Sequence, residues 1–177
     1  MKNLKSLDYH ILTELINNSR ISDRQLARKI GVSQPTITRR RTALEKARLL
    51  EYTSIPDLEK LDFEILAITF ADWNHDKFPD EKTNQAKTFL SKHSCMMFMS
   101  TGRGLGFDRV YITAHKAYSD YARFMRDLKK DWEQYMNRLD SFMVSLKSDN
   151  ILRRLTFKCL AESIAKGTKS PGNKSVD

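Results

Sequence analysis

Apolar residues near the start of the chain recur every three or four positions, which is the spacing of one helix face. This stripe predicts a helix, and its members are Leu7, Ile11, Leu12, Leu15 and Ile16. Ser6 is expected to cap the start of this helix, and the polar run 17–19 is expected to end it. Two further helices are expected to close a small core with Leu26, Ile30, Ile37 and Leu44.

The residues that follow predict a second, shorter helix and a sharp turn. Ser22 stands three positions before Gln25, a capping-box spacing in which each side chain satisfies a free amide at the start of a helix. The helix is expected to run to Ile30. Gly31 comes next, and glycine takes the left-handed conformation that ends helices at little cost.

A third helix is predicted after Ser33, which can cap it, and Pro35 is tolerated in a first turn whose amides lack partners anyway. At 100° per residue, Ile37 and Leu44 lie within about 20° of each other and mark the inward face. The opposite face is polar and cationic, and it comprises Gln34, Pro35, Thr38, Arg39, Thr42 and Lys46. Two helices joined by a glycine turn form a helix-turn-helix, which places its second helix in the major groove of DNA.

The side chains of this third helix suit DNA. Threonine and glutamine can hydrogen-bond base edges, and arginine can fork onto a guanine or a phosphate. The candidate DNA-binding residues are therefore Ser22, Ser33, Gln34, Thr36, Thr38, Arg39, Arg40, Arg41 and Thr42. The plainer alternative is a solvated helix face that carries a run of charge.

Charge also favours an anionic partner. The chain has 177 residues, a formal net charge of +9 and a sequence pI of about 9.6. Residues 1–56 contain eleven Lys and Arg against five Asp and Glu, which accounts for +6 of that charge. Such a concentration suits a phosphate backbone, because binding there releases condensed counterions. The sequence shows no secretory segment and no apolar run of about 18 residues, so we expect a soluble, cytoplasmic protein without membrane contact.

The rest of the chain predicts an α+β domain. Residues 49–55 have strand composition and are expected to form a wing or linker strand that Pro56 ends. Later strands are predicted at 63–73, 95–100, 108–115 and 141–146, with helices from 79–80 to about 92 and from 118 to 136. This βαββαβ order is that of the ferredoxin-like fold.

The organisation of the remaining segments is less regular. The helix over 118–136 has a core stripe of Tyr118, Tyr121, Ala122, Met125, Leu128, Trp132 and Met136. Residues 151–164 fit both a helix and a strand, and we favour a short edge segment followed by a helix from about Thr156. The residues from Lys166 onward predict a flexible tail. The predicted domains are a helix-turn-helix domain with its linker strand at 1–56, a ferredoxin-like domain at 57–165 and a tail at 166–177.

Several N-terminal residues match the sequence pattern of a known DNA-binding domain. They are Leu7-Asp8, Ile11-Leu12, Ser33, Thr36-Ile37, Arg39-Arg40 and Leu44-Glu45. In these the segment resembles the DNA-binding domain of the Lrp/AsnC family of transcription regulators, with an archaeal-type member favoured. Two positions depart from the family pattern, because Arg41 stands where an apolar residue is usual and Arg48 where a glycine usually closes the helix. The βαββαβ order is also that of the family's effector-sensing domain, so the resemblance covers nearly the whole chain.

The resemblance implies a sequence-specific transcription regulator that binds double-stranded DNA at a palindromic operator, as a homodimer or higher oligomer. Family members place small-molecule effectors, often amino acids, at the turn between the second and third strands of the second domain. The corresponding residues are Thr101, Gly102, Arg103 and Asp108. Arg103 can hold a carboxylate by forked hydrogen bonds, and the alternative is a solvated loop arginine. Gly102, Gly104 and Gly106 themselves suit a hairpin turn that needs positive φ.

Other functions have less support. Sirohaem decarboxylases also resemble Lrp/AsnC proteins, and here His93, His115, Arg103 and Arg109 could meet a tetrapyrrole carboxylate. A small-molecule sensor or assembly module without DNA binding is the third interpretation. An enzyme has no need of a cationic recognition helix, so we expect neither enzyme activity nor a cofactor. Cys95 and Cys159 form no CxxC motif and are expected to be buried reduced thiols, and His93 beside Cys95 gives too few ligands for a metal.

Overall fold

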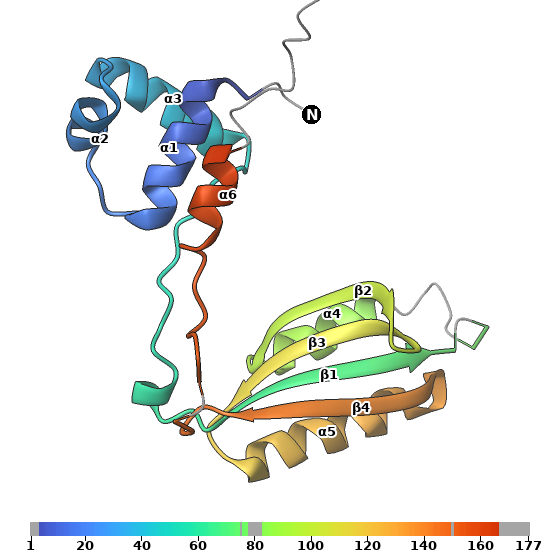
Figure 1. Ribbon diagram of the computed structural model, residues 1–177. Coiled ribbons are helices and arrows are strands. Elements are labelled where there is room, and N and C mark those ends of the chain that lie inside the picture. Colours follow the sequence, from blue (N-terminus) through green and yellow to red (C-terminus); the bar gives the residue numbers. More distant parts are fainter. Residues whose placement is uncertain (1–3, 75, 78–82, 150, 167–177) are drawn as a thin grey trace, which may run out of the picture. The chain divides into compact units, whose positions relative to one another are not determined.

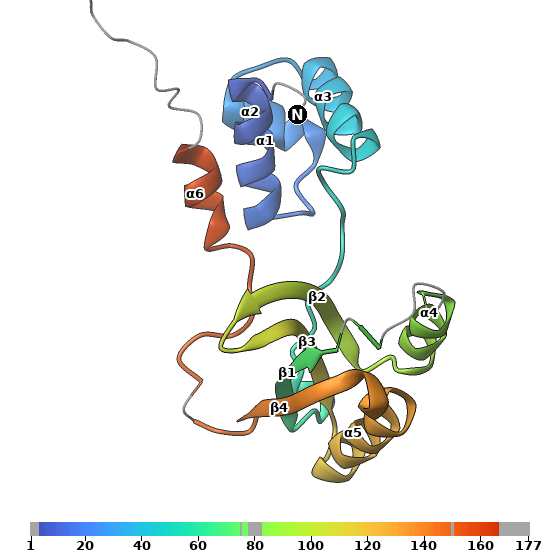
Figure 2. The same ribbon diagram turned by 90° about the vertical axis from the view of Figure 1, so that its right-hand side faces the viewer.

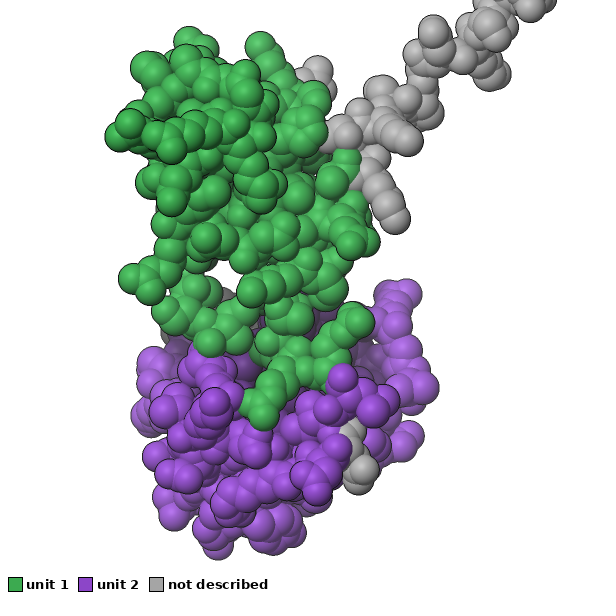
Figure 3. Space-filling view, turned by 60° about the vertical axis from the view of Figure 1, so that its left-hand side comes forward, with its two compact units in different colours: residues 1–55, 153–177 green, residues 56–152 purple. Residues whose placement is uncertain are grey.

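The chain forms two compact units. The computed structural model describes residues 4–74, 76–77, 83–149 and 151–166. One unit comprises residues 1–55 together with 153–177, and the other comprises residues 56–152, as the two colours of Figure 3 show. Both ends of the chain therefore belong to the first unit.

The first unit is helical. Its helices are α1 (Ser6–Asn17), α2 (Asp23–Ile30), α3 (Gln34–Lys46) and α6 (Leu160–Lys166), which Figure 1 labels. The predicted apolar positions of the first three helices form its core, in which Ile11, Leu15, Leu26, Ile37 and Leu44 are all buried. The predicted three-helix arrangement is thus confirmed.

The predicted capping of α2 is present in full. Ser22 is the N-cap, its hydroxyl accepts from the Gln25 amide at 3.3 Å, and Gln25 Oε1 accepts from the Ser22 amide at 3.1 Å. Gly31 ends the helix at φ 80° and ψ 34°, the left-handed conformation that glycine adopts without a Cβ penalty. These local interactions set the tight turn between α2 and α3.

The start of α1 differs from the prediction. Lys5, not Ser6, is the N-cap residue, and the carboxylate of Asp8 accepts a hydrogen bond from the Lys5 amide at 2.8 Å. An acid three residues into a helix can satisfy that orphan amide and also complements the helix dipole. Ser6 is therefore the first helical residue, while Asn18 ends the helix within the polar run that was expected to do so.

The strand predicted over 49–55 is wrong, since none of these residues pairs in a sheet. A strand needs a hydrogen-bonding neighbour, and the described strands all lie in one sheet of the other unit. Tyr52 instead turns back to α3, where its hydroxyl donates to Glu45 Oε1 at 2.8 Å. Arg48, which precedes this segment, has φ 54°, so the chain leaves α3 through the conformation that a glycine would favour.

The C-terminal helix was expected in the second domain, but it packs in the first unit. Ala161 of α6 is buried, Ile164 packs against the helical core, and the Thr13 hydroxyl of α1 donates to the Ala161 carbonyl at 3.4 Å. The helix begins at Leu160 rather than near Thr156, because the Thr156 hydroxyl accepts from the Lys158 amide in a local turn. Residues 151–159 contain no strand, and the predicted tail from 167 onward lies outside the described residues.

The second unit is a four-stranded antiparallel sheet with helices on one face, as Figures 1 and 2 show. After the 3-10 turn η1 (Glu59–Leu61), its elements are β1 (Ile65–Trp73), α4 (Thr83–Lys92), β2 (Met96–Gly104), β3 (Phe107–His115), α5 (Tyr118–Trp132), the 3-10 turn η3 (Glu133–Tyr135) and β4 (Met136–Ser145). The strands lie in the order β2-β3-β1-β4. This arrangement confirms the predicted ferredoxin-like fold.

Several boundaries in this unit differ from the prediction. Helix α5 ends at Trp132, and β4 begins at Met136 instead of near 141. The predicted glycine-rich loop is largely strand, because β2 continues to Gly104 and only Leu105 and Gly106 form the turn, both at positive φ. The core stripe of α5 includes Phe124, which the prediction missed, whereas Tyr118 is exposed. The helix start predicted at 79–80 lies outside the described residues.

Candidate nucleic-acid interface

The outer face of α3 is exposed as its spacing predicted. Gln34, Pro35, Arg39, Thr42 and Lys46 are all exposed, while Ile37 and Leu44 are buried on the opposite side. Within the described part of the chain, the guanidinium of Arg39 has neither a hydrogen bond nor an ion pair. A long cationic side chain in this state keeps its donors available for an external acceptor.

The hydroxyl groups at the start of α3 have partners within the unit. Ser33 occupies the N-cap position without capping the backbone, and its hydroxyl lies 2.8 Å from that of Thr36. The Thr38 hydroxyl donates to Asp23 Oδ2 at 2.7 Å and is also 3.2 Å from the Gln34 carbonyl oxygen. Ser22 is engaged in the cap of α2. These hydrogen bonds fix the orientation of α2 relative to α3. The partner of Thr38 is a surface side chain of α2, that of Asp23, so this bond can be exchanged for another.

Arg40 is directed into the fold rather than outward. Its Nε donates to Asp8 Oδ1 at 2.7 Å, and its Nη2 donates to Asp8 Oδ2, so the pair is bidentate. The Asp8 side chain is 1% exposed and that of Arg40 is 26% exposed. A buried carboxylate is tolerated only when it is paired and hydrogen-bonded, so this contact fixes α3 against α1.

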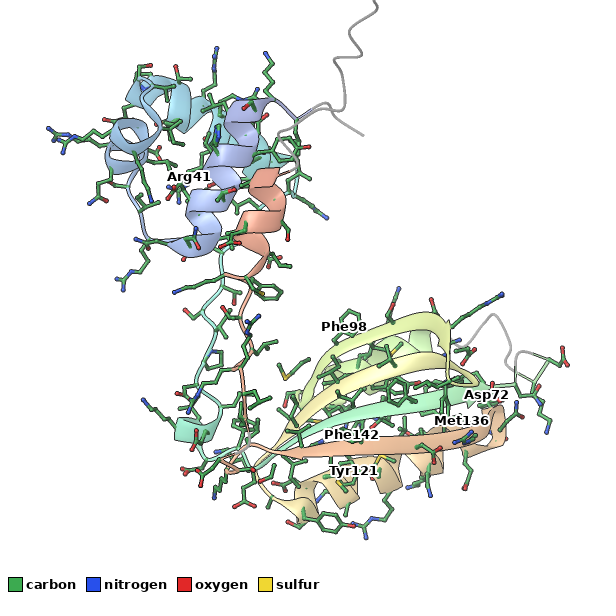
Figure 4. All side chains as sticks on the ribbon, viewed as in Figure 1. Arg41, Asp72, Phe98, Tyr121, Met136 and Phe142 are labelled. Atoms are coloured by element: carbon green, nitrogen blue, oxygen red, sulfur yellow. The ribbon has the colours of Figure 1, made fainter. Side chains whose placement is uncertain are left out.

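Arg41 is held within the same unit by several acceptors, and Figure 4 shows it among the helices. Its guanidinium donates to Asp23 Oδ1 at 2.9 Å, to the Tyr52 hydroxyl at 2.6 Å and to the Ile21 carbonyl at 3.2 Å. Burial opposes the charge of Arg41, but the hydrogen bonds that it donates to Asp23 and Tyr52 outweigh this effect and raise its pKa. Of the three consecutive arginines, Arg39 therefore remains the one directed to solvent.

The partners of these arginines were not predicted as functional residues. Asp8 lies at helical spacing with Ile11, Leu12 and Leu15, and an acid on an apolar stripe is a recognisable sign of a buried ion pair. Tyr52 and Asp23 carried no such sign, because their contacts depend on how the chain folds back on α3. Burial and the neighbouring carboxylate of Glu45 raise the pKa of Tyr52, so its hydroxyl stays protonated.

The two units differ sharply in charge. Residues 1–55 and 153–177 contain 17 Lys and Arg and 7 Asp and Glu, a formal charge of +10. Residues 56–152 contain 14 and 15, a formal charge of −1. The net positive charge of the protein therefore resides in the helical unit, to which both chain ends contribute.

The candidate effector residues lie around the β2–β3 hairpin. Thr101, Gly102 and Arg103 are exposed on β2. The Asp108 carboxylate instead accepts from the Trp73 amide at 3.1 Å, next to the irregular pairing of β1 and β4. Asp108 thus supports the strand locally, and Arg103 is the exposed cation of the hairpin.

Of the two histidines considered for a tetrapyrrole site, His115 is buried and His93 is half-buried. The Nε2 atom of His115 is 2.8 Å from the Thr113 hydroxyl, and the His115 ring packs on Tyr121 and Phe124. The ring of His93 packs on Phe89. Cys95 is half-buried and Cys159 is exposed, which corrects the expectation that both thiols are buried. Across the described residues, no group of three or more His, Cys, Asp or Glu side chains is placed to hold a metal ion, and no helix is long and apolar enough to cross a membrane.

Comparison with known proteins identifies the N-terminal domain. Residues 4–45 match the model of the AsnC-type helix-turn-helix domain, which covers α1, α2 and nearly all of α3. An HTH-type transcriptional regulator of Pyrococcus furiosus is 28% identical over 128 residues, which are 71% of this chain and 81% of that protein. Residues 4–45 thus form an AsnC-type helix-turn-helix domain, and the chain is similar to a transcriptional regulator beyond that domain.

Two further comparisons extend the likeness to transcriptional regulators. The HTH-type transcriptional regulator LrpC of Bacillus subtilis is 38% identical over 69 residues, which are 38% of this chain and 48% of LrpC. The solved structure of a transcriptional regulator from Neisseria meningitidis in complex with L-Met has a TM-score of 0.71 at 16% identity, and the match covers 88% of this chain and 96% of that one. At that identity the structural likeness establishes the fold alone.

Proposed function

We propose that this protein is a sequence-specific DNA-binding transcription regulator of the Lrp/AsnC family, which acts in the cytoplasm and not as an enzyme. The observation that carries the proposal is the outer face of α3, where Arg39, Gln34, Thr42 and Lys46 are exposed on a helix-turn-helix locked by Asp8 and Asp23. A rigid helix with free donors is what major-groove recognition requires. The charge of +10 on the same unit supplies the attraction to phosphates.

We propose different roles for the candidate DNA-binding residues, according to whether their side chains have partners within the protein. Gln34, Arg39 and Thr42 are proposed to meet base edges or phosphates directly, with Lys46 beside them. Ser22, Ser33, Thr36 and Thr38 are proposed to orient the two helices, and Thr38 can exchange its bond to Asp23 for one to DNA. Arg40 and Arg41 are proposed to position α3, because their guanidinium groups bind acceptors of the protein.

Self-association is supported by the open face of the sheet. Helices α4 and α5 cover one face, and no described segment of this unit covers the other (Figure 2). Phe98, Ile112, Ile68 and Phe142 are paired in register and form one apolar row across all four strands. Phe98 is 51% exposed and Phe142 is 65% exposed, and Figure 4 labels both. An apolar row of this length is typical of an interface, and we propose that a second copy covers it.

A homodimer built on this sheet would present two recognition helices to a palindromic site, with half-sites roughly 34 Å apart. Substitution Phe142→Glu places a charge in the proposed interface, at the β4 end of the apolar row, and should convert the dimer to a monomer in sedimentation experiments. The matched control is Asp140→Glu on the same strand, which should leave the dimer intact. A Phe142→Glu protein that remains dimeric would exclude this face of the sheet as the dimer interface.

The DNA-binding proposal is tested by titrating the protein on DNA from its own promoter region and on a scrambled duplex of equal length. The experiment is run at about 50 mM and 200 mM salt, because phosphate contacts lose affinity steeply with salt. We expect at least roughly tenfold preference for the promoter fragment, with the preference kept at both salt concentrations. Equal, weak binding to both duplexes would mean that the helical unit binds DNA only through its charge, without sequence specificity.

An effector is proposed on family grounds as a small molecule such as an amino acid. The exposed hairpin residues Thr101, Gly102 and Arg103 remain the proposed contacts on this surface, with Arg103 as the carboxylate ligand. Asp108 is proposed to shape the hairpin through its bond to Trp73.

A further inference from the structure

The second unit contains a small, partly open cavity on the helix-covered side of its sheet. The cavity has a volume of about 50 Å³ and lies between strands β1, β2 and β3 and helices α4 and α5. Its walls are mostly apolar and include Trp73, Phe89, Leu128 and Trp132. Two polar side chains also line it, Arg109 and Tyr111. At roughly 10–15 Å³ for each water-sized volume, it holds about three to five such volumes.

Arg109 is the unusual member of this wall. Its guanidinium carbon lies 4.8 Å from the centroid of the Trp73 ring, which supports the cation through its π face. The Nε atom of Arg109 is buried and has no hydrogen-bond acceptor in the described structure. Leaving a charged donor buried without an acceptor is costly, so such a group is expected to have a partner in the working protein.

Tyr111 provides a second donor beside it. The hydroxyl oxygen accepts from Trp73 Nε1 at 3.0 Å, which leaves its own hydrogen to be directed elsewhere. Burial raises the pKa of Tyr111 to about 12, so this hydroxyl is protonated at neutral pH. A cation and a neutral donor on one cavity wall define the kind of partner that is missing, which is a small anion.

We propose that this cavity binds a short aliphatic monocarboxylate, with its carboxylate on Arg109 and Tyr111 and its alkyl chain among Trp73, Phe89, Leu128 and Trp132. A carboxylate matches the fork of an arginine, and acetate to butyrate match the volume. Among the described residues, no Asp or Glu lines the cavity, so none of them would pair with the ammonium group of an amino acid. The ligand class therefore differs from the amino acids considered for the exposed hairpin.

The site would act as an effector site only if the proposed regulatory function holds, but binding itself does not depend on DNA. The chain contains two tryptophans, and both line the cavity. Tryptophan fluorescence of the full chain, recorded without DNA, therefore reports directly on occupancy. Acetate, propionate and butyrate are titrated to about 50 mM at constant ionic strength, with chloride as the reference anion.

We expect a saturable fluorescence change with propionate or butyrate and none with chloride. Arg109→Gln should weaken binding at least about tenfold, because a charge-assisted bond is lost. The matched control Arg126→Gln, at an exposed position of α5 outside the cavity, should bind as the unaltered protein does. Tyr111→Phe keeps the ring in place and should weaken binding several-fold. It provides the test of the site if Arg109→Gln fails to fold.

Three results would overturn the proposal. The first is that none of the carboxylates gives a saturable fluorescence change. The second is that the Arg109→Gln and Tyr111→Phe proteins bind the carboxylate with the same affinity as the unaltered protein. The third is tighter binding of alanine or leucine than of butyrate in a manner that depends on Arg109. Because DNA is absent from the experiment, none of these outcomes bears on whether the helical unit binds an operator.

Discussion

Arg40 of α3 and Asp8 of α1 form a bidentate ion pair whose carboxylate is almost completely buried. The same carboxylate accepts from the Lys5 amide, so it both begins α1 and holds α3. This relationship changes the role expected of the arginine run, because the middle arginine belongs to the framework of the domain. It also gives the first prediction.

Substitution Asp8→Ala should destabilise the protein by about 3 kcal/mol, because it removes a cap and leaves the Arg40 guanidinium without its partner. The measurement is urea unfolding followed by circular dichroism. The matched control on the same helix is Glu14→Ala, whose partner Lys29 is 58% exposed, and it should cost less than about 1 kcal/mol. Equal costs for the two variants would mean that the Asp8–Arg40 pair does not support the fold.

Arg48 should be replaceable by glycine with a gain in stability. Its φ of 54° lies in the left-handed region, which costs an L-residue roughly 1–2 kcal/mol and costs glycine nothing. Part of that gain is offset by the greater freedom of glycine in the unfolded chain, so we expect Arg48→Gly to stabilise by about 0.5–1 kcal/mol. Thermal unfolding measures this. Ala43→Gly within α3 is the control and should destabilise by about 1 kcal/mol.

The stability of the second unit should fall in mild acid because of His115. Burial lowers the pKa of this ring, with Asp120 opposing the shift only in part. As the pH falls below about 6.5, His115 becomes protonated in the unfolded chain but stays neutral in the folded protein. The free energy of unfolding therefore decreases until the pH reaches the lowered pKa of the folded state. Each unit by which the pKa of His115 is lowered changes the free energy of unfolding by about 1.4 kcal/mol.

Unfolding free energies measured between pH 7.5 and roughly 5 test this dependence. His115→Gln should remove that part of the slope, because glutamine does not titrate. The same substitution at exposed His10 should leave the slope in place. An unchanged slope in the His115→Gln protein would assign the acid sensitivity to other groups.

Features that rest on neighbouring residues were the ones that the sequence could predict. The Ser22–Gln25 box, the left-handed Gly31 and the inward pair Ile37 and Leu44 each depend on contacts within a few positions. The βαββαβ order was equally accessible, because periods of two and of about four residues distinguish strands from helices. Exposure of Arg39 followed from the same helical geometry.

Features that rest on distant residues were not predictable in this way. Arg40 was expected on DNA, but its partner Asp8 lies 32 residues earlier, and nothing local indicates that they meet. Residues 49–55 have strand composition, yet Tyr52 is drawn to Arg41 and Glu45 instead of to a neighbouring strand. Helix α6 packs on α1 through Ala161 and Ile164, a contact that short-range periodicity cannot reveal.

Contact between the outer face of α3 and DNA is best tested with the substitution Arg39→Ala. Its affinity for the promoter fragment is compared with that of Arg123→Ala, which removes the same charge from α5, and unfolding curves are recorded for both proteins. We predict that Arg39→Ala weakens specific binding by roughly 5–150-fold with unchanged stability, and that Arg123→Ala binds as the unaltered protein does. Unaltered promoter affinity in the folded Arg39→Ala protein would contradict the account.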